Sequence, residues 1–326
     1  MVRLPKLVPA FSSKGFFTDV DPKTGKRVSE VANALDAHGP TLTTLLVSSF
    51  DMFHGLLRDP GAHFRGKELV FVDSGGYELS EDFDGTEPRQ YAGKPALEFN
   101  QDQYDAVLRA LPRDLPFVIA NFDFASRGLE VESQIRSARA LLAQYPSFLS
   151  DFIVKPSARR AAYLDVEEIV FHLNDMRSFQ ILGITEREAG KTLLDRLVTI
   201  ARLRQALDER GMTTPIHVWG GLDPLITPMY FCAGAEVFDG ISWMRYGYHD
   251  DVALPRDAYT ALVFGIQAQK TRSIHLRLAN NLDYLEKAEM RMKEFVQDGC
   301  ASFSVFGAHC TAIEAGYRAL LSRVAR

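Results

Sequence analysis

The sequence of 326 residues predicts a (β/α)₈ TIM-type barrel of the α/β class with additional C-terminal helices. Eight short runs are almost continuously apolar, which is typical of parallel strands buried on both faces. Amphipathic stretches of helical length lie between several of them, as in βαβ units with right-handed crossovers. About eight strands fit a closed barrel better than an open doubly wound sheet, which typically has ~5 or 6.

The expected strands are Leu7–Phe11, Thr44–Ser49, Leu69–Ser74, Phe117–Asp123, Phe152–Pro156, Phe179–Thr185, Ile216–Gly221 and Val237–Ser242. The expected helices between them are Asp102–Leu111, Glu130–Gln144, Asp165–Met176 and Arg187–Arg210. We expect 1–326 to be one domain, with 257–326 a helical part packed on the barrel that contains a long helix over Leu276–Gln297. A flavodoxin-like or Rossmann sheet is the alternative, but no G-x-G-x-x-G follows the first strand and no Walker A loop occurs.

The composition excludes several classes of protein. The three cysteines, Cys232, Cys300 and Cys310, form no C-x-x-C pair, so neither a disulfide framework nor a zinc ribbon is indicated. No signal peptide and no membrane span of ~18 apolar residues is recognisable, so we expect a cytoplasmic protein without membrane contact. The net charge of −5 means that any binding of nucleic acid would depend on a local basic patch.

Polar residues follow the apolar part of several expected strands. They are Asp73 on the third, Asp123 on the fourth, Lys155 on the fifth, Thr185 and Glu186 on the sixth, and Asp239 on the eighth. In a barrel these positions all open onto the catalytic face. Each carboxylate could instead be a helix N-cap or a turn former, but several on one face favour a functional site.

The segment Asp73-Ser74-Gly75-Gly76-Tyr77 is the most informative part of the sequence. Two glycines after a strand let the backbone pass very close to a ligand, and a tyrosine offers a flat face for stacking. A Gly-Gly turn between a strand and a helix is also common elsewhere. The next segment, Ser80–Gln101, is acidic and rich in Gly and Pro, and is either a lid or a surface insertion.

The segment at 73–77 resembles the D-S-G-G-[FY]-Q signature of the tRNA-guanine transglycosylase family, with Glu78 in place of the Gln. Phe122-Asp123 is similar to the family's A-F-D-E-C strand, and HVWGGLDP at 217–224 to its L-M-G-V-G-x-P-x-D turn. AEVFD at 235–239, with Arg245 six residues later, is similar to G-[IV]-D-M-F-D-C-V-x-P-T-R. The resemblance implies a barrel enzyme that exchanges guanine in nucleic acid for a 7-deazaguanine.

The resemblance implies a role for each matching carboxylate. Asp239 would attack the anomeric carbon of the ribose, displace guanine and hold a covalent glycosyl-enzyme intermediate, as a carboxylate does in retaining glycosidases. Asp73 would be the general acid and base for the departing or arriving base. Asp123 would bind the Watson–Crick edge of the purine, since a carboxylate accepts two N–H donors at once.

Other matching positions would contact the substrate. Tyr77 would stack on the base, Gly183 and Gly220 would offer backbone groups where a side chain would clash, and Arg245 would lie near a phosphate. The complete set of expected substrate-binding residues is Ser74, Gly75, Gly76, Tyr77, Asp123, Lys155, Gly183, Trp219, Gly220 and Arg245.

The chain departs from the family at its zinc site. Family members bind a structural zinc through C-x-C-x-x-C and a later His, but no cysteine lies between Asp239 and Cys300. Asn280, within the segment LANNLDYL that resembles the family's H-N-L-x-[FY]-L, stands where the ligand His belongs. We therefore predict that the zinc is absent and expect no other cofactor. Replacement by His309, Cys300 and Cys310 would fall short of the four ligands of tetrahedral zinc.

The expected base pocket also differs. Lys155 takes the place of a Gln, Phe124 and Ala125 replace Glu and Cys, and Trp219 replaces a Met. Lys155 would hold an anionic group or pair with Glu186.

Basic residues in the C-terminal part of the sequence are expected to form either a solvated helix face or a phosphate-binding groove. They are Arg245, Lys270, Arg272, Arg277, Lys287, Arg291 and Lys293, with Arg202 and Arg204 open to the same two interpretations.

Three hypotheses of function follow. The first is base exchange in tRNA or DNA, on a nucleotide that has left its stack. The second is hydrolysis of the N-glycosidic bond of a nucleoside or nucleotide on the same fold. The third is a non-catalytic accessory subunit, against which the presence of both Asp73 and Asp239 argues. A homodimer or a partner subunit is compatible with each.

Overall fold

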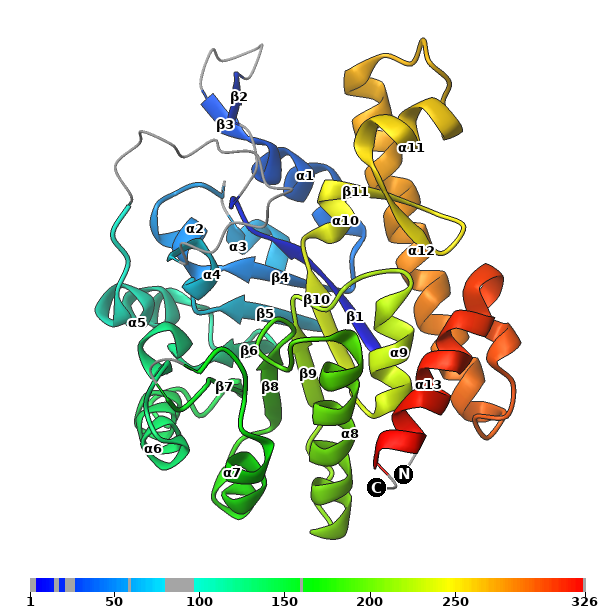
Figure 1. Ribbon diagram of the computed structural model, residues 1–326. Coiled ribbons are helices and arrows are strands. Elements are labelled where there is room, and N and C mark those ends of the chain that lie inside the picture. Colours follow the sequence, from blue (N-terminus) through cyan, green and yellow to red (C-terminus); the bar gives the residue numbers. More distant parts are fainter. Residues whose placement is uncertain are drawn as a thin grey trace. The chain divides into compact units, whose positions relative to one another are not determined.

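The chain is described by a computed structural model over residues 4–14, 18–20, 27–57, 60–79, 97–158 and 161–324 (Figure 1). Eight parallel strands form a closed barrel in the order β1-β10-β9-β8-β7-β6-β5-β4. The (β/α)₈ fold predicted from the sequence is therefore confirmed. Most of the segment considered as a lid, residues 80–96, lies outside the described residues.

All eight expected strands are present. They are β1 (Lys6–Phe11), β4 (Thr44–Ser48), β5 (Leu69–Asp73), β6 (Phe117–Ala120), β7 (Leu149–Val154), β8 (Ile181–Thr185), β9 (Ile216–Trp219) and β10 (Val237–Gly240). Every residue of β4, β6, β9 and β10 is buried, which explains why these strands lack an alternating polar face. Several strand ends differ from the prediction by one to three residues. The difference that concerns a site residue is at β6, which stops at Ala120, so that Asp123 begins the short 3₁₀ helix η2 (Asp123–Ser126).

Two short antiparallel hairpins were not predicted from the sequence. β2 (Thr18–Val20) pairs with β3 (Arg27–Ser29), and β11 (Tyr246–His249) pairs with β12 (Val252–Pro255). Asp250 and Asp251, which join β11 to β12, both have positive φ angles of 47° and 59°. Aspartate tolerates this left-handed conformation better than most residues, so the turn can be tight without glycine.

The helices expected between strands are present as α5 (Gln101–Ala110), α6 (Val131–Leu142), α7 (Val166–Phe171) with η3 (Leu173–Met176), and α8 (Leu193–Glu209). Further helices are α1 (Glu30–His38), η1 (Gly39–Thr41), α2 (Ser49–Phe53), α3 (Pro60–Phe64), α4 (Gly76–Leu79), α9 (Ile226–Ala233) and α10 (Ser242–Arg245). The C-terminal part contains α11 (Arg256–Val263), α12 (Lys270–Gln297), η4 (Phe303–His309) and α13 (Cys310–Val324). None of the helices among the described residues combines the length and apolarity needed to cross a membrane.

The described chain divides into two compact units. The larger unit contains the described residues of Met1–Pro9, Arg127–Arg136 and Phe152–Arg326, and the smaller unit those of Ala10–Ser126 and Ser137–Asp151. Within the larger unit, α13 packs against α8 and α9 (Figure 1). In the same unit, a carboxylate oxygen of Glu289 on α12 accepts a hydrogen bond from the backbone N–H of Leu7 at 3.1 Å.

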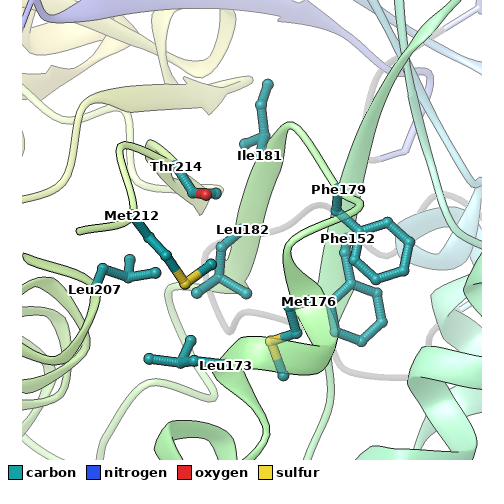
Figure 2. A pocket seen from close by; sticks show the side chains of 9 residues that line it. All are labelled: Phe152, Leu173, Met176, Phe179, Ile181, Leu182, Leu207, Met212 and Thr214. Carbon is teal, nitrogen blue, oxygen red and sulfur yellow. The ribbon is translucent and has the colours of Figure 1, made fainter. Parts of the chain in front are cut away.

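An apolar pocket that leaves no space for a water molecule lies in the larger unit, lined mainly by side chains of β7, β8, η3 and α8 (Figure 2). Its lining consists of Phe152, Leu173, Met176, Phe179, Ile181, Leu182, Leu207, Met212 and Thr214. The rings of Phe152 and Phe179 stack there with centroids 4.7 Å apart. Because this lining holds no acid, base or strong nucleophile, the pocket belongs to the packing of the core and not to a chemical site.

The start of α8 is fixed by a capping box. The Thr192 hydroxyl accepts a hydrogen bond from the Asp195 N–H at 3.1 Å, and the Asp195 carboxylate accepts one from the Thr192 N–H at 3.1 Å. We expect Thr192→Ala to lower the free energy of unfolding by about 1 kcal/mol, because one N–H of the first turn loses its acceptor. Urea denaturation measures the change. Thr192→Ser keeps the hydroxyl and is the control; equal losses in both variants would contradict the capping role.

Candidate functional site

Asp239 is held in place by groups of the neighbouring strand. It is the third residue of β10, is 6% exposed, and pairs in register with Val8 of β1. Its Oδ1 accepts a hydrogen bond from the N–H of Gly220 at 2.9 Å and lies 3.2 Å from Nε2 of His217. Its Oδ2 makes no hydrogen bond with any residue of the described ranges. Two donors thus fix the orientation of the Asp239 carboxylate through one of its oxygens.

The strand β9 supplies both groups that contact Asp239. His217 is fully buried, and its Nε2 must carry the proton, since a carboxylate oxygen can only accept. Gly220 follows the strand with a φ of 79°, a conformation that costs glycine little and turns its N–H toward the carboxylate. The Gly220 N–H thus binds the Asp239 carboxylate, and its expected contact with a substrate stays a prediction.

Trp219 lies beside the same histidine. The two rings have centroids 4.4 Å apart with their planes tilted by 31°, because residues 217 and 219 project from the same face of β9. Trp219 is 8% exposed, and its indole Nε1 is buried without a hydrogen-bond partner among the described residues. A buried N–H donor without an acceptor is unfavourable, which makes this atom an unusual feature of the site.

Lys155 directly follows β7 and is held in a network of charges. Its Nζ lies 3.1 Å from Oε2 of Glu188, which also accepts a hydrogen bond from the Thr185 hydroxyl. Arg127 approaches the other oxygen of Glu188 at 3.2 Å. The side-chain amide of Gln134 bonds to both the N–H and the C=O of Lys155, each at 2.9 Å. Lys155 therefore forms an ion pair as one interpretation predicted, but the carboxylate is Glu188.

Glu186, which the sequence suggested as the ion-pair partner of Lys155, contacts other residues. It accepts hydrogen bonds from the Tyr230 hydroxyl at 2.7 Å and from Arg196 at 3.0 Å. Burial raises the pKa of the Glu186 carboxyl, and these two donors lower it only in part. Asp223 accepts hydrogen bonds from the N–H groups of Leu225 and Ile226 at the start of α9, so this acid has a structural role.

The substrate contacts expected of Gly183 and Arg245 stay predictions. Gly183 lies in the middle of β8, opposite His217 in register. Arg245 is the last residue of α10 and is half-buried, and its carbonyl accepts a hydrogen bond from Arg256 at 3.2 Å.

In the smaller unit, Asp73 and Asp123 are grouped around Tyr104. Asp73 is the half-buried last residue of β5, in register with Ser48, whereas Asp123 is 6% exposed. The Tyr104 hydroxyl donates to the carbonyl of Ala120 at 2.6 Å. Burial raises the pKa of Tyr104 well above its ordinary value, and the charges of Asp73 and Asp123 raise it further. The charges of both acids therefore affect the pKa of the same hydroxyl group.

The Ser-Gly-Gly turn connects Asp73 to Asp123. The Ser74 hydroxyl donates a hydrogen bond to Oδ1 of Asp123. A side chain at Gly76 would bring a Cβ atom within 3.0 Å of the same oxygen. Gly75 has a φ of 81°, and a Cβ there would lie 2.9 Å from the ring of Phe99. Because neither glycine has a side chain, the turn can approach the Phe99 ring and the Asp123 carboxylate closely.

Tyr77 is already in contact with a cation on one face of its ring. The ammonium group of Lys14 lies 4.4 Å from the ring centroid and donates a hydrogen bond to the Tyr77 carbonyl at 2.6 Å. Lys14, which lies three residues after the end of β1, is only 6% exposed. A base that stacks on Tyr77 would therefore have to use the other face of the ring.

Two neighbouring acids lie in the same unit, the buried Asp51 and the half-buried Glu78. The Ser13 hydroxyl and N–H donate to the two oxygens of Asp51, and the Ser12 hydroxyl donates to Glu78 at 2.6 Å. Burial and the neighbouring charge of Glu78 raise the pKa of Asp51 well above its ordinary value, although the Ser13 donors lower it. Burial also raises the pKa of Glu78.

This raised pKa predicts a pH dependence of stability. The folded state binds the Asp51 proton more tightly than the unfolded state, so stability falls as the pH rises from 3.8 through the raised pKa. We expect a smaller fall in Asp51→Asn, measured by urea denaturation from about pH 4 to about pH 8. Asp283→Asn, at an exposed residue that pairs with Lys287, is the control. An unchanged slope in Asp51→Asn would contradict the assignment.

Several of these residues were not assigned from the sequence. His217 was quoted within a motif without a role, and Lys14, Asp51 and Glu188 were not considered as site residues. The expected strand Leu7–Phe11 is directly followed by Ser12, Ser13 and Lys14. Their position after a buried strand could have marked them as site residues, as it did Asp73. His217 stands out as the polar residue of a buried strand. No sequence signal points to Gln134, because its contact with Lys155 is formed between distant segments.

Asn280 stands where the resemblance places a zinc ligand. The amide of Asn280 donates to the Tyr259 hydroxyl at 3.0 Å, so it takes part in the contact between α12 and α11. In the described ranges, no three His, Cys, Asp or Glu residues are grouped so that they could hold a metal ion. Cys232, Cys300 and Cys310 are free thiols. The zinc content of the protein remains a prediction.

The basic residues of the C-terminal part are mostly engaged within the protein. Arg277 is 1% exposed and donates to the carbonyls of Met244 and Tyr246, so it is not part of a phosphate-binding groove. Lys287, Arg291 and Lys293 pair with Asp283, Asp251 and Glu289, respectively. The interpretation as a solvated helix face is also wrong for Arg204, which is 5% exposed and pairs with Glu236 at 3.0 Å.

Comparison with known proteins adds no identification to this geometry. No family model matches the chain, and no curated protein matches it. The structure defines the protein as a (β/α)₈ barrel with C-terminal helices and a pre-oriented, buried carboxylate.

Proposed function

We propose that the protein is a base-exchange transglycosylase related to the tRNA-guanine transglycosylases, which replaces guanine in nucleic acid by a 7-deazaguanine. The observation that carries the proposal is the arrangement of Asp239. A nucleophilic carboxylate needs one oxygen directed at the reacting carbon and a fixed orientation of the group. The two donors on Oδ1, and an Oδ2 that makes no hydrogen bond with the described residues, support this role.

The proposed reaction begins with attack of Asp239 Oδ2 on the anomeric carbon. A bond forms from this oxygen to the carbon, and the carbon–nitrogen bond to guanine breaks, with its electron pair passing to the base. The resemblance assigns the supply of the proton that the departing base takes up to Asp73, which lies in the smaller unit. An incoming 7-deazaguanine then loses a proton to Asp73 and displaces Asp239, which restores the free carboxylate. The reaction needs no metal ion or redox partner.

The buried acid Asp123 is proposed to recognise the base. Its Oδ1 already accepts a hydrogen bond from Ser74, which fixes the orientation of the carboxylate. Its second oxygen and the remaining lone pair of the first can accept N–H groups of a purine. Tyr77 would stack on the base with the ring face that Lys14 does not cover.

The choice between tRNA and DNA stays part of the proposal. The described basic residues of α12 that we expected to track phosphates are largely paired with acids or buried. Recognition of a polynucleotide would then depend on other residues or on a second protein chain, such as a second copy or a partner subunit.

The test is incubation of the protein with labelled guanine and either tRNA or DNA. Denaturation then stops the reaction, and gel electrophoresis detects a covalent adduct between protein and polynucleotide. Incorporation of label into one polynucleotide supports base exchange and identifies the substrate. Release of free base without incorporation would instead support hydrolysis of the N-glycosidic bond. If neither reaction occurs with either polynucleotide or with a free nucleoside, the catalytic proposal is wrong and an accessory role remains.

A further inference from the structure

We propose that the indole N–H of Trp219 donates a hydrogen bond to an acceptor atom of the purine base bound beside Asp239, and so helps to select the base. The inference rests on the proposed function, because it takes the ligand of Asp239 to be a nucleoside. It goes beyond that function by assigning a polar role to a side chain that would otherwise only line the pocket.

The first argument is the unsatisfied donor itself. Trp219 is 8% exposed, and its Nε1 has neither a protein acceptor among the described residues nor contact with solvent. Buried polar groups in folded proteins almost always have a hydrogen-bond partner. A phenylalanine or methionine would fill similar space without this unfavourable group, so the indole is expected to gain its partner from a ligand.

The second argument is the position of the ring. Trp219 stacks against His217, whose Nε2 is 3.2 Å from Oδ1 of Asp239. Gly220, the next residue in the chain, donates its N–H to the same oxygen at 2.9 Å. The indole is therefore adjacent on two sides to groups that hold the nucleophile.

The third argument concerns the ligand. The base is bonded directly to the anomeric carbon, so it must lie next to Asp239 when that carbon is attacked. Guanine offers the acceptors O6, N7 and N3, and the indole can only donate. Because Nε1 is covered by protein atoms, the indole or a neighbouring side chain must shift slightly when the base binds. The emission of Trp219 should report this shift.

The chain provides a matched pair of variants, because it contains only two tryptophans, Trp219 and Trp243. Trp243 is fully buried in α10, and Trp243→Phe is the control for the same change in size. Titration with guanine should change the tryptophan fluorescence of the wild type and of Trp243→Phe, but not that of Trp219→Phe. Circular dichroism of each variant verifies folding.

Affinities measured by equilibrium dialysis then identify the acceptor. The ligands are guanine, 7-deazaguanine without N7, 3-deazaguanine without N3, and 2-aminopurine without O6. We expect Trp219→Phe to weaken binding about tenfold for guanine and for all analogues except the one that lacks the partner of the indole. Trp243→Phe should bind all four as the wild type does.

The outcomes separate this inference from the proposed function. Equal losses for every base in Trp219→Phe, or no loss for any, would overturn the hydrogen bond even if label enters a polynucleotide. Failure of the wild type to bind any of the four bases would also overturn it. Base-selective loss without incorporation of label would support the Trp219 contact and refute base exchange.

Discussion

Asp239→Asn is expected to abolish incorporation of labelled guanine and formation of the covalent adduct, with a loss of rate on the order of 10⁴-fold or more. An amide is a far poorer nucleophile than a carboxylate and cannot stabilise the positive charge that develops at the anomeric carbon. The variant should fold, because the amide oxygen can still accept the hydrogen bond from Gly220. Single-turnover incorporation and adduct trapping measure the effect.

The neighbouring histidine provides a graded control for this prediction. His217→Gln keeps an N–H donor for Oδ1, whereas His217→Leu removes it. We expect His217→Leu to slow the reaction about tenfold and His217→Gln to restore part of the loss, since His217 orients the nucleophile without touching the substrate. Full activity in Asp239→Asn would refute the assignment of the nucleophile. Equal losses in both histidine variants would refute the positioning role.

Glu236→Ala is expected to have the largest effect on stability, lowering the free energy of unfolding by about 3–5 kcal/mol. Glu236 and Arg204 form an ion pair at 3.0 Å in which both side chains are buried. The other oxygen of Glu236 accepts the N–H of Ile216 at 2.8 Å, and Arg204 also donates to the carbonyls of Met212 and Thr214. Removal of the carboxylate leaves the buried Arg204 with only the half-exposed Asp208, 3.1 Å from its Nε, as a counterion, and leaves a backbone donor without an acceptor.

A surface ion pair serves as the comparison. Arg202 and Glu167 lie 2.9 Å apart, with 51% and 76% of their side chains exposed, so Glu167→Ala should cost less than about 1 kcal/mol. Urea denaturation at neutral pH measures both variants. Similar losses for Glu236→Ala and Glu167→Ala would contradict the prediction. Because Glu236 immediately precedes β10, which carries Asp239, the loss of stability should be accompanied by lower activity near the unfolding transition.

The strands of the barrel were predictable because each is a local feature. A strand buried on both faces must be apolar over consecutive residues, and the eight runs of this kind became the eight strands. The ends were less accurate, as at β6, because a polar residue after an apolar run can continue the strand or start a turn. The hairpin of β11 and β12 was missed since its residues carry no alternating pattern and its turn contains Asp250 and Asp251 in place of glycine.

The sequence by itself determined the eight strands, the position of Asp239 in the last strand of the barrel and of Asp73 at the end of the third, and the glycines that follow Asp73. Only the tertiary structure decided the partners of these groups. Lys155 pairs with Glu188, Ser74 bonds to Asp123, and Gly220 anchors Asp239. The reason is physical: apolar patterns follow from burial residue by residue, whereas hydrogen bonds and ion pairs depend on side chains brought together from distant segments.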